Sequence, residues 1–212
     1  MFGQQRDVDL ILGKTGSGKT TLARQLISAR NRVIIADADY HEYPAKEFLT
    51  LDELADYLER NAIGRGSFFR VSYTPYEHEY PFMCDVARIV GNCTLVLEEA
   101  DRFPDPRYCM EYQEIIARGR HDGVSIMALG LYPALLPSML RRQATRIISF
   151  RQHEPADIEW LAAVMGEAAE QLPNLGDHEY LEWYSGVGEM RPKKLALDSA
   201  GKKREDHRVA KN

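Results

Sequence analysis

The feature that most constrains this chain is the octapeptide GKTGSGKT at residues 13–20, which follows the apolar segment Val8–Leu12 and precedes a segment with helical periodicity. The first and last glycines of the motif bracket four residues, and Lys and Thr follow. Such glycines let a bare backbone wrap around anionic oxygens at a helix N-terminus. Because both flanking elements are present, the motif predicts a phosphate-binding P-loop rather than an ordinary glycine-rich turn.

The P-loop prediction assigns particular roles to the residues of the motif. Lys19 is expected to reach the β- and γ-phosphates of ATP, and Thr20 is expected to ligate Mg²⁺. The sequence contains no guanine-reading Asn-Lys-X-Asp segment, which slightly favours ATP over GTP. The predicted nucleotide-binding residues are Gly13, Lys14, Thr15, Gly16, Ser17, Gly18, Lys19, Thr20 and Thr21.

Short apolar runs alternate with helix-like segments, which predicts an α/β fold with a largely parallel central sheet flanked by helices. The predicted strands are Val8–Leu12, Arg32–Asp37, Ser67–Tyr73, Thr94–Glu98, Val124–Gly130 and Arg146–Phe150. The predicted helices are Lys19–Arg30, Leu51–Asn61, Tyr80–Val90, Tyr108–Arg118, Ala134–Gln143 and Pro155–Met165. Two more short strands are expected at His178–Tyr184 and Pro192–Leu197.

Length and charge predict the domain organisation. A chain of 212 residues with 44% hydrophobic content can bury one substantial core. We expect one P-loop domain over residues 1–199 and a basic, disordered tail over residues 200–212. The net charge of −5 gives no overall basic signature, although residues 190–212 hold eight Lys or Arg against three acids. Total charge therefore does not predict nucleic-acid binding.

Cysteine usage and hydropathy bear on the compartment. Cys84, Cys93 and Cys109 are spaced too irregularly for a zinc ribbon, and their odd number argues against a complete disulfide framework. We therefore expect a reducing, intracellular environment. No apolar run approaches the roughly 20 residues that span a bilayer, and the N-terminus lacks signal-peptide features. A soluble protein without a membrane span is expected.

Hydrolysis needs a metal-coordinating carboxylate and a group that orients water, in addition to a P-loop. The apolar segment Thr94–Leu97 is followed directly by Glu98 and Glu99. We expect Glu98 to approach Mg²⁺ and Glu99 to polarise the attacking water. Two adjacent carboxylates repel each other without a nearby cation, which favours this interpretation over a pair of surface acids. Asp101 either contributes to the site or caps the following helix.

Arginines suited to phosphoryl-transfer chemistry lie in the segment Ala117–Gly123. A guanidinium stays charged and donates two parallel hydrogen bonds, so it can neutralise a transferring γ-phosphoryl group, often from a neighbouring subunit. Arg120 and Arg118 are therefore candidate arginine fingers. The alternative is that they are solvated or pair with Glu111 and Glu114.

Tyrosines and histidines gather in two predicted loop regions. Such side chains can stack on a nucleobase, but packing against the sheet edge is the more ordinary role and the one we expect. The residues are Tyr40, His41, Tyr43, Tyr73, Tyr76, His78 and Tyr80.

The order of these segments resembles the FtsK/HerA superfamily of DNA-pumping ATPases. The similarity is carried by the GKTGSGKT loop, the apolar run ending in EEADRF and the RGRHDG segment before a strand. The segment 146–160, with IISFR and then Glu-Pro opening a helix, is most similar to the small genome-packaging ATPases of tailless, membrane-containing icosahedral viruses. The resemblance covers roughly residues 6–197.

The resemblance implies a RecA-like (ASCE-type) core and a homo-oligomeric ring with ATP and Mg²⁺ between subunits. It implies Walker A roles for Lys19 and Thr20, a Walker B role for Glu98, a catalytic role for Glu99 and a finger role for Arg120. The chain departs from the family in two respects. At the position of Glu98 the family often has Asp, although Glu also occurs there. The family often ends its next strand with a Gln that senses the γ-phosphate, whereas residues 128–132 read ALGLY.

Two functions follow as expectations. The first is a translocase that pumps double-stranded DNA into a viral capsid, in the host cytoplasm or with the virion, and that has a capsid vertex protein as a partner. The alternative is a nucleotide-switched phage morphogenesis or assembly protein that does not move DNA. A small-molecule kinase would need an arginine-rich lid, and the sequence offers none at suitable positions.

Overall fold

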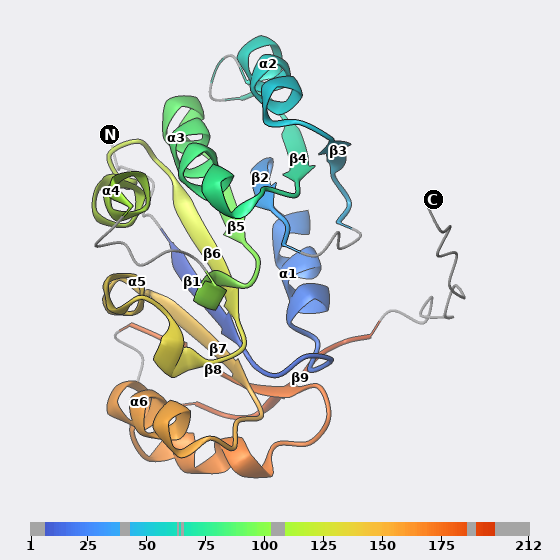
Figure 1. The fold of residues 1–212 in the computed structure, drawn as a ribbon. Coiled ribbons are helices and arrows are strands. Elements are labelled where there is room, and N and C mark those ends of the chain that lie inside the picture. The colour runs from blue at the N-terminus through green and yellow to red at the C-terminus, as the bar shows by residue number, and fades with distance from the viewer. Residues whose placement is uncertain are drawn as a thin grey trace, which may run out of the picture.

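The computed structural model describes residues 7–38, 43–62, 64, 66–102, 109–185 and 190–197, which form a nine-stranded sheet in the order β3-β4-β2-β5-β6-β1-β7-β8-β9 (Figure 1). The first seven strands of that order run parallel to one another, β8 pairs antiparallel with β7, and β9 pairs antiparallel with β8. The predicted tail 200–212 lies outside the described residues, as do Tyr40 and His41.

The observed elements follow the predicted order. The strands are β1 (Val8–Leu12), β2 (Arg32–Ala36), β3 (Lys46–Phe48), β4 (Phe69–Tyr73), β5 (Thr94–Leu97), β6 (Ser125–Gly130), β7 (Arg146–Phe150), β8 (Glu179–Tyr184) and β9 (Lys193–Lys194). The helices are α1 (Lys19–Ser28), α2 (Leu51–Asn61), α3 (Tyr80–Val90), α4 (Met110–Arg118), α5 (Ser138–Arg142) and α6 (Pro155–Met165). The predicted largely parallel α/β sheet is confirmed.

Side chains of the parallel strands alternate between two buried faces. In β1, Leu10 and Leu12 belong to a core cluster to which α2 through α6 contribute, whereas Ile11 packs with α1. Figure 1 shows α3, α4 and α5 on one side of the sheet and α1 on the other. Fully burying each such aliphatic side chain contributes about 1.5–3 kcal/mol, so both faces stabilise the position of β1.

The predicted helix Ala134–Gln143 is wrong as a single element. The chain instead forms a short 3-10 turn, Pro133–Leu135, and then α5. Leu136 between them is extended, with φ −58° and ψ 142°. The reason is Pro137, which restricts the residue before it to extended conformations and cannot continue a helical hydrogen-bond ladder.

Several of the described elements were not predicted from the sequence, among them β3 and a 3-10 helix after α6. The edge strand β3 has three residues, too few to show alternation, and pairs in parallel with β4. The 3-10 helix Gly166–Asn174 follows α6 and packs against it. Only two residues of the predicted strand Pro192–Leu197 form a strand, β9. Among the described residues, no helix combines the length and apolar character needed to cross a membrane.

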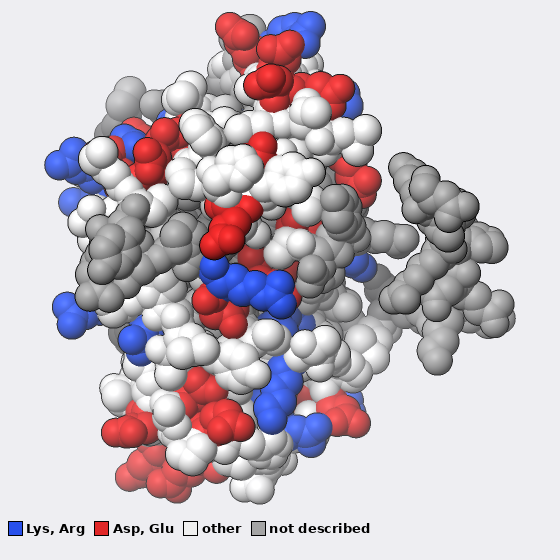
Figure 2. All heavy atoms as spheres, viewed as in Figure 1, with Lys and Arg blue, Asp and Glu red and all other residues white. Residues whose placement is uncertain are grey.

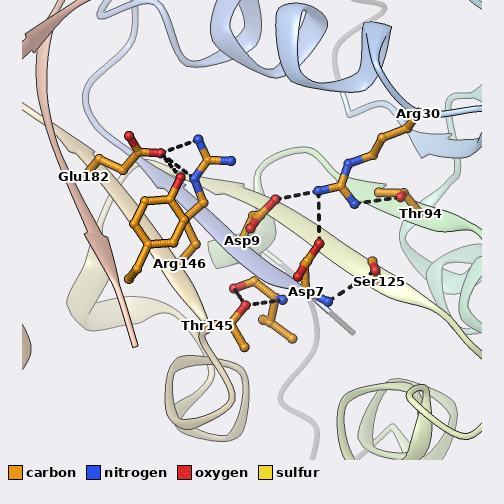
Figure 3. A network of polar contacts seen from close by, with 10 residues as sticks. Asp7, Asp9, Arg30, Thr94, Ser125, Thr145, Arg146 and Glu182 are labelled. Atoms are coloured by element: carbon orange, nitrogen blue, oxygen red, sulfur yellow. Dashed lines mark hydrogen bonds and ion pairs between the residues drawn. The ribbon is translucent and has the colours of Figure 1, made fainter. Parts of the chain in front are cut away.

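Ion pairs tie strands together at the amino-terminal edge of the parallel sheet (Figure 3). Arg30 lies just beyond α1 and donates to Asp9 Oδ2 of β1 at 2.9 Å and to Thr94 Oγ1 of β5 at 2.9 Å. The Asp9 carboxyl is buried, and this burial raises its pKa, although the charge of Arg30 opposes the shift. Arg30 therefore bridges two strands that β6 separates.

A second ion pair joins β7 to β8 at this edge. The Arg146 guanidinium donates from Nε to Glu182 Oε1 at 2.6 Å, and Tyr184 donates its phenol to the same oxygen at 2.7 Å. Lys193 of β9 also contacts the carboxylate. Burial alone would raise the pKa of Glu182, but the hydrogen bonds from Lys193, Tyr184 and Arg146 lower it on balance.

Candidate nucleotide-binding site

Residues 13–20 form a loop between β1 and α1 at the carboxyl-terminal edge of the parallel strands. Gly13 donates its backbone N–H to Gly130 O at 3.1 Å, which joins the loop to the end of β6. Gly16 and Gly18 adopt φ values of 79° and 107°, a region that disfavours side chains with a β-carbon. A β-carbon on Gly18 would also lie 2.7 Å from Leu195 Cδ2. The loop conformation therefore needs glycine at both positions.

The Lys19 side chain crosses the loop from its C-terminal to its N-terminal end. Its ammonium donates to Gly13 O at 2.7 Å and to Lys14 O at 3.2 Å. Burial lowers the pKa of Lys19, and the nearby carboxylates of Glu98, Asp101 and Glu99 oppose that shift. The ammonium thus lies among the backbone groups of the loop, where an anion would meet it.

Thr20 and Glu98 meet, although they come from α1 and from the end of β5. The Thr20 hydroxyl donates to Glu98 Oε1 at 3.3 Å. Glu98 is buried, and its backbone N–H donates to Ala36 O at 3.1 Å, which fixes the strand end beside β2. A hydroxyl and a carboxylate within hydrogen-bond distance of each other can share one hard cation.

The Thr20 hydroxyl and the Glu98 carboxylate suit Mg²⁺ better than they suit a metal ion that takes all its ligands from the protein. Among the described residues, no cluster of three or more His, Cys, Asp or Glu could hold a metal ion. Mg²⁺ usually keeps several waters and binds one or two protein groups together with substrate phosphates. Thr20 and Glu98 would therefore hold the ion only when a nucleotide supplies phosphate oxygens.

Glu99 forms an ion pair with an arginine, and its backbone lies in the left-handed region. Its φ is 50°, in the left-handed region that costs a non-glycine residue roughly 1 kcal/mol. Its carboxylate Oε2 lies 2.6 Å from Arg102 Nη1. Strained backbone of this kind clusters at functional sites. The role of Glu99 in polarising water stays a prediction, and one of its carboxylate oxygens pairs with Arg102 in this structure.

Asp101 lies in the 3-10 turn Ala100–Arg102 and accepts a hydrogen bond from Leu131 N at 3.3 Å. The carboxylate therefore points to the end of β6. A β-carbon on Gly130 would lie 3.2 Å from Leu136 Cδ2, which is a tight contact, and 3.4 Å from Asp101 Oδ1, which is an ordinary contact distance. Both expectations for Asp101 stay predictions, and the observed contact is with the residue that follows β6.

Arg118 and Arg120 lie at the opposite edge of the sheet from the P-loop. They precede β6, which runs parallel to β1, so they occupy the amino-terminal edge, and both are exposed. Glu114, one expected partner, pairs instead with Arg88 at 2.5 Å. Neither arginine can reach a phosphate on its own P-loop, so a finger role would require the P-loop of another subunit.

Several residues near the site were not predicted to belong to it. Tyr43 donates its phenol to Glu98 Oε1, although packing was its expected role. His178 Nδ1 lies 3.1 Å from Ser17 O of the P-loop. Gln152, which follows β7, is 1% exposed, and its Nε2 has no hydrogen-bond partner in the described part of the chain. The sequence alone does not identify these residues as part of the site, because they lie in distant segments that only the folded sheet brings together.

The strand order places one strand, β6, between the P-loop strand β1 and the acid-bearing strand β5. Together with the loop geometry and the Thr20–Glu98 contact, this order defines the RecA-like class of P-loop NTPase folds. No protein-family model matches the sequence, and no curated protein matches it significantly.

Solved structures with this fold are similar over nearly the whole chain. The genome packaging NTPase B204 from Sulfolobus turreted icosahedral virus 2, in complex with ATP-gammaS, gives a TM-score of 0.74 at 18% identity, covering 90% of this chain and 98% of that chain. VirB4 of Thermoanaerobacter pseudethanolicus gives 0.63 at 14% identity, covering 94% and 92%. The bacterial conjugative coupling protein TrwB gives 0.60 at 11% identity, covering 89% and 84%.

These neighbours are FtsK/HerA-type P-loop ATPases, so the resemblance expected from the sequence is confirmed at the level of the fold. The RecA-like fold class is confirmed as well.

Proposed function

We propose that this chain is a Mg²⁺-dependent ATPase that pumps double-stranded DNA into a viral capsid as a homo-oligomeric ring. The observation that carries the proposal is the match to B204, a genome packaging NTPase, over 90% of this chain and 98% of the other. B204 has also been solved with AMPPCP and with AMP. The P-loop with its Thr20–Glu98 contact supports nucleotide binding in this chain.

In this proposal each site residue has a distinct task. The backbone of residues 13–18 and the Lys19 ammonium hold the phosphates, and Thr20 and Glu98 hold Mg²⁺. When bound, the ion neutralises charge on the β- and γ-phosphates. Glu99 orients water after leaving Arg102. Arg120, or Arg118, reaches the γ-phosphate of the adjacent subunit.

The surface for DNA is a separate question from the nucleotide site. On the face shown in Figure 2, acidic and basic side chains of the described residues are interspersed rather than gathered into one basic area. The basic segment 200–212 either contributes phosphate contacts or remains a solvated tail. Binding through phosphates would weaken steeply as salt rises. A capsid vertex protein and a location in the host cytoplasm or the virion complete the proposal.

The experiment that tests this function is steady-state ATP hydrolysis with and without long double-stranded DNA, at several protein concentrations. Wild type is compared with Glu99→Gln and Arg120→Ala. A ring translocase requires turnover that rises with DNA and with concentration, and that collapses in both variants. Tight ATP binding with turnover indifferent to DNA and to Arg120 would overturn the motor.

That second result would leave the alternative, a nucleotide-switched assembly protein that does not move DNA. One observation favours it. The end of β6 is Gly130, which carries no side chain to sense the γ-phosphate. A chain without that sensor can still change shape on binding nucleotide while hydrolysing it slowly.

A further inference from the structure

Tyr43 lies at the boundary between the hydrophobic core and the metal-binding acid. Its side chain is 6% exposed and belongs to the core cluster on the α1 face of the sheet. The Arg24 guanidinium of α1 lies 5.6 Å from the ring centroid. Core packing therefore holds the ring, while the phenol reaches out of the core toward the carboxyl-terminal edge of the sheet.

The phenol donates to Glu98 Oε1, the same oxygen that accepts from the Thr20 hydroxyl. Two hydroxyls from different elements thus converge on one carboxylate oxygen. Together they restrict the rotation of the carboxylate about its terminal bond.

We propose that Tyr43 is a positioning residue that holds the Glu98 carboxylate in the orientation needed to bind Mg²⁺ with the nucleotide. The inference rests on the proposed function and deepens it. Groups that hydrogen-bond to metal ligands orient those ligands, and their loss typically costs 10–100-fold in metal affinity or activity. Tyr43 comes from the segment after β2, so it adds a third element to a metal site otherwise built from α1 and β5.

The competing explanation is that Tyr43 only fills space against α1. The two roles predict different responses to metal. A packing role would affect the stability of the fold and would alter nucleotide binding equally with and without Mg²⁺. A positioning role would leave metal-free nucleotide binding intact and would raise the Mg²⁺ concentration needed for tight binding.

The test is calorimetric titration of ATP-gammaS in EDTA and across a series of Mg²⁺ concentrations, with wild type, Tyr43→Phe and Tyr73→Phe. Tyr43→Phe keeps the buried ring and removes only the hydroxyl. Tyr73→Phe is the matched control, because Tyr73 is also buried and donates to a carboxylate, Glu79 Oε2, at 2.7 Å. Glu79 is not among the residues proposed to hold nucleotide or metal.

We expect Tyr43→Phe to raise the half-saturating Mg²⁺ concentration about 10-fold, with less than about a two-fold change in EDTA. Tyr73→Phe should match wild type in both conditions. A Tyr43→Phe curve that overlies wild type, or an equal loss of affinity in EDTA, would overturn the inference. Failure of Mg²⁺-dependent nucleotide binding, on which the inference rests, gives a different result, since wild type itself would then show no Mg²⁺-dependent binding of ATP-gammaS. Failure of DNA pumping alone is detected in the hydrolysis experiment and leaves this titration unchanged.

Discussion

The two edges of the sheet both carry buried charges, but they pair those charges differently. At the amino-terminal edge, Asp9 lies 2.9 Å from Arg30, and Glu182 accepts a hydrogen bond from Arg146. At the carboxyl-terminal edge, Glu98 accepts from two hydroxyls, and Lys19 donates to backbone carbonyls. The first edge neutralises its charges within the protein.

The second edge carries the P-loop, where we propose that a nucleotide and its metal bind. A nucleotide with its metal would bring phosphate to Lys19 and Mg²⁺ to Glu98. Paired charges across strands stabilise the fold at the first edge, whereas the charged groups at the second edge are proposed to bind a ligand. Substitutions at the two edges should accordingly separate stability from binding.

The largest effect on binding is expected from Lys19→Met at the P-loop. Losing the buried ammonium should weaken ATP-gammaS binding by about 100-fold or more, a cost in the range for removing one partner of a buried charge contact. The free energy of unfolding should stay within about 0.5 kcal/mol or rise, because burial lowers the pKa of Lys19 and so disfavours its charge. Calorimetric titration and urea unfolding measure the two quantities.

The largest effect on stability is expected from Arg30→Ala at the other edge. Asp9 is 1% exposed, so removal of its cation should cost about 3 kcal/mol. The double variant Arg30→Met with Asp9→Leu should recover most of that loss, because it leaves no unpaired buried charge. Urea unfolding provides the measurement. A single variant as stable as wild type would contradict the structural role, whereas loss of ATP-gammaS binding without loss of stability would place Arg30 in the site.

The contrast between the edges also explains how far the sequence could predict this molecule. Continuous apolar runs such as Val33–Ile35 are typical of buried parallel strands. The positions of the strands and the α/β class could therefore be predicted from the local sequence pattern. The Walker A loop followed for the same reason, since its glycines, Lys19 and Thr20 are contiguous. Glu98 and Glu99 could be placed because they end an apolar strand.

The partners of those residues could not be predicted. Tyr43 reaches Glu98 across 55 residues, and His178 reaches Ser17 across 161. Arg30 contacts both Asp9 of β1 and Thr94 of β5 because only β6 separates those strands in the sheet. Such contacts depend on strand order and on rotamers, and neither is encoded in a local spacing. Arg120 as a trans-acting finger stays a prediction, because it concerns a second subunit.

A smaller effect is expected at the amino-terminal edge, where the contributions of Glu182 and Asp9 to the free energy of unfolding should depend differently on pH. The folded pKa of Glu182 is lowered from 4.5, so its contribution is present above pH 4.5 and is lost as pH falls through the folded value. The folded pKa of Asp9 is raised from 3.8, so its contribution has the opposite sign and declines as pH rises through the folded value.

Glu182→Gln should therefore lower the free energy of unfolding at pH 7 more than Asp9→Asn does, and it should flatten the decline of stability toward acid. Thermal unfolding between pH 7 and pH 3 measures both. Two variants with the same pH profile would contradict the assignment of opposite shifts.

The smallest effect is expected at His178, where β8 begins beside the P-loop before it runs to the amino-terminal edge. His178 has a φ of 60°, and its Nδ1 lies 3.1 Å from Ser17 O. His178→Ala should cost about 1 kcal/mol, because it removes this hydrogen bond, while the strain of a β-carbon in a left-handed conformation is the same as in wild type. His178→Gly removes the bond but relieves the backbone, so its cost should be smaller.

Comparing these variants by urea unfolding with and without ATP-gammaS tests whether β8 links the two edges. If the His178 contact braces the P-loop, both variants should lose the same few-fold in ATP-gammaS affinity despite their different stabilities, because both lose the same contact to Ser17. Equal stabilities would contradict the backbone argument. Unchanged affinities would mean that β8 supports the amino-terminal edge alone, through Glu182, and that the nucleotide site is independent of it.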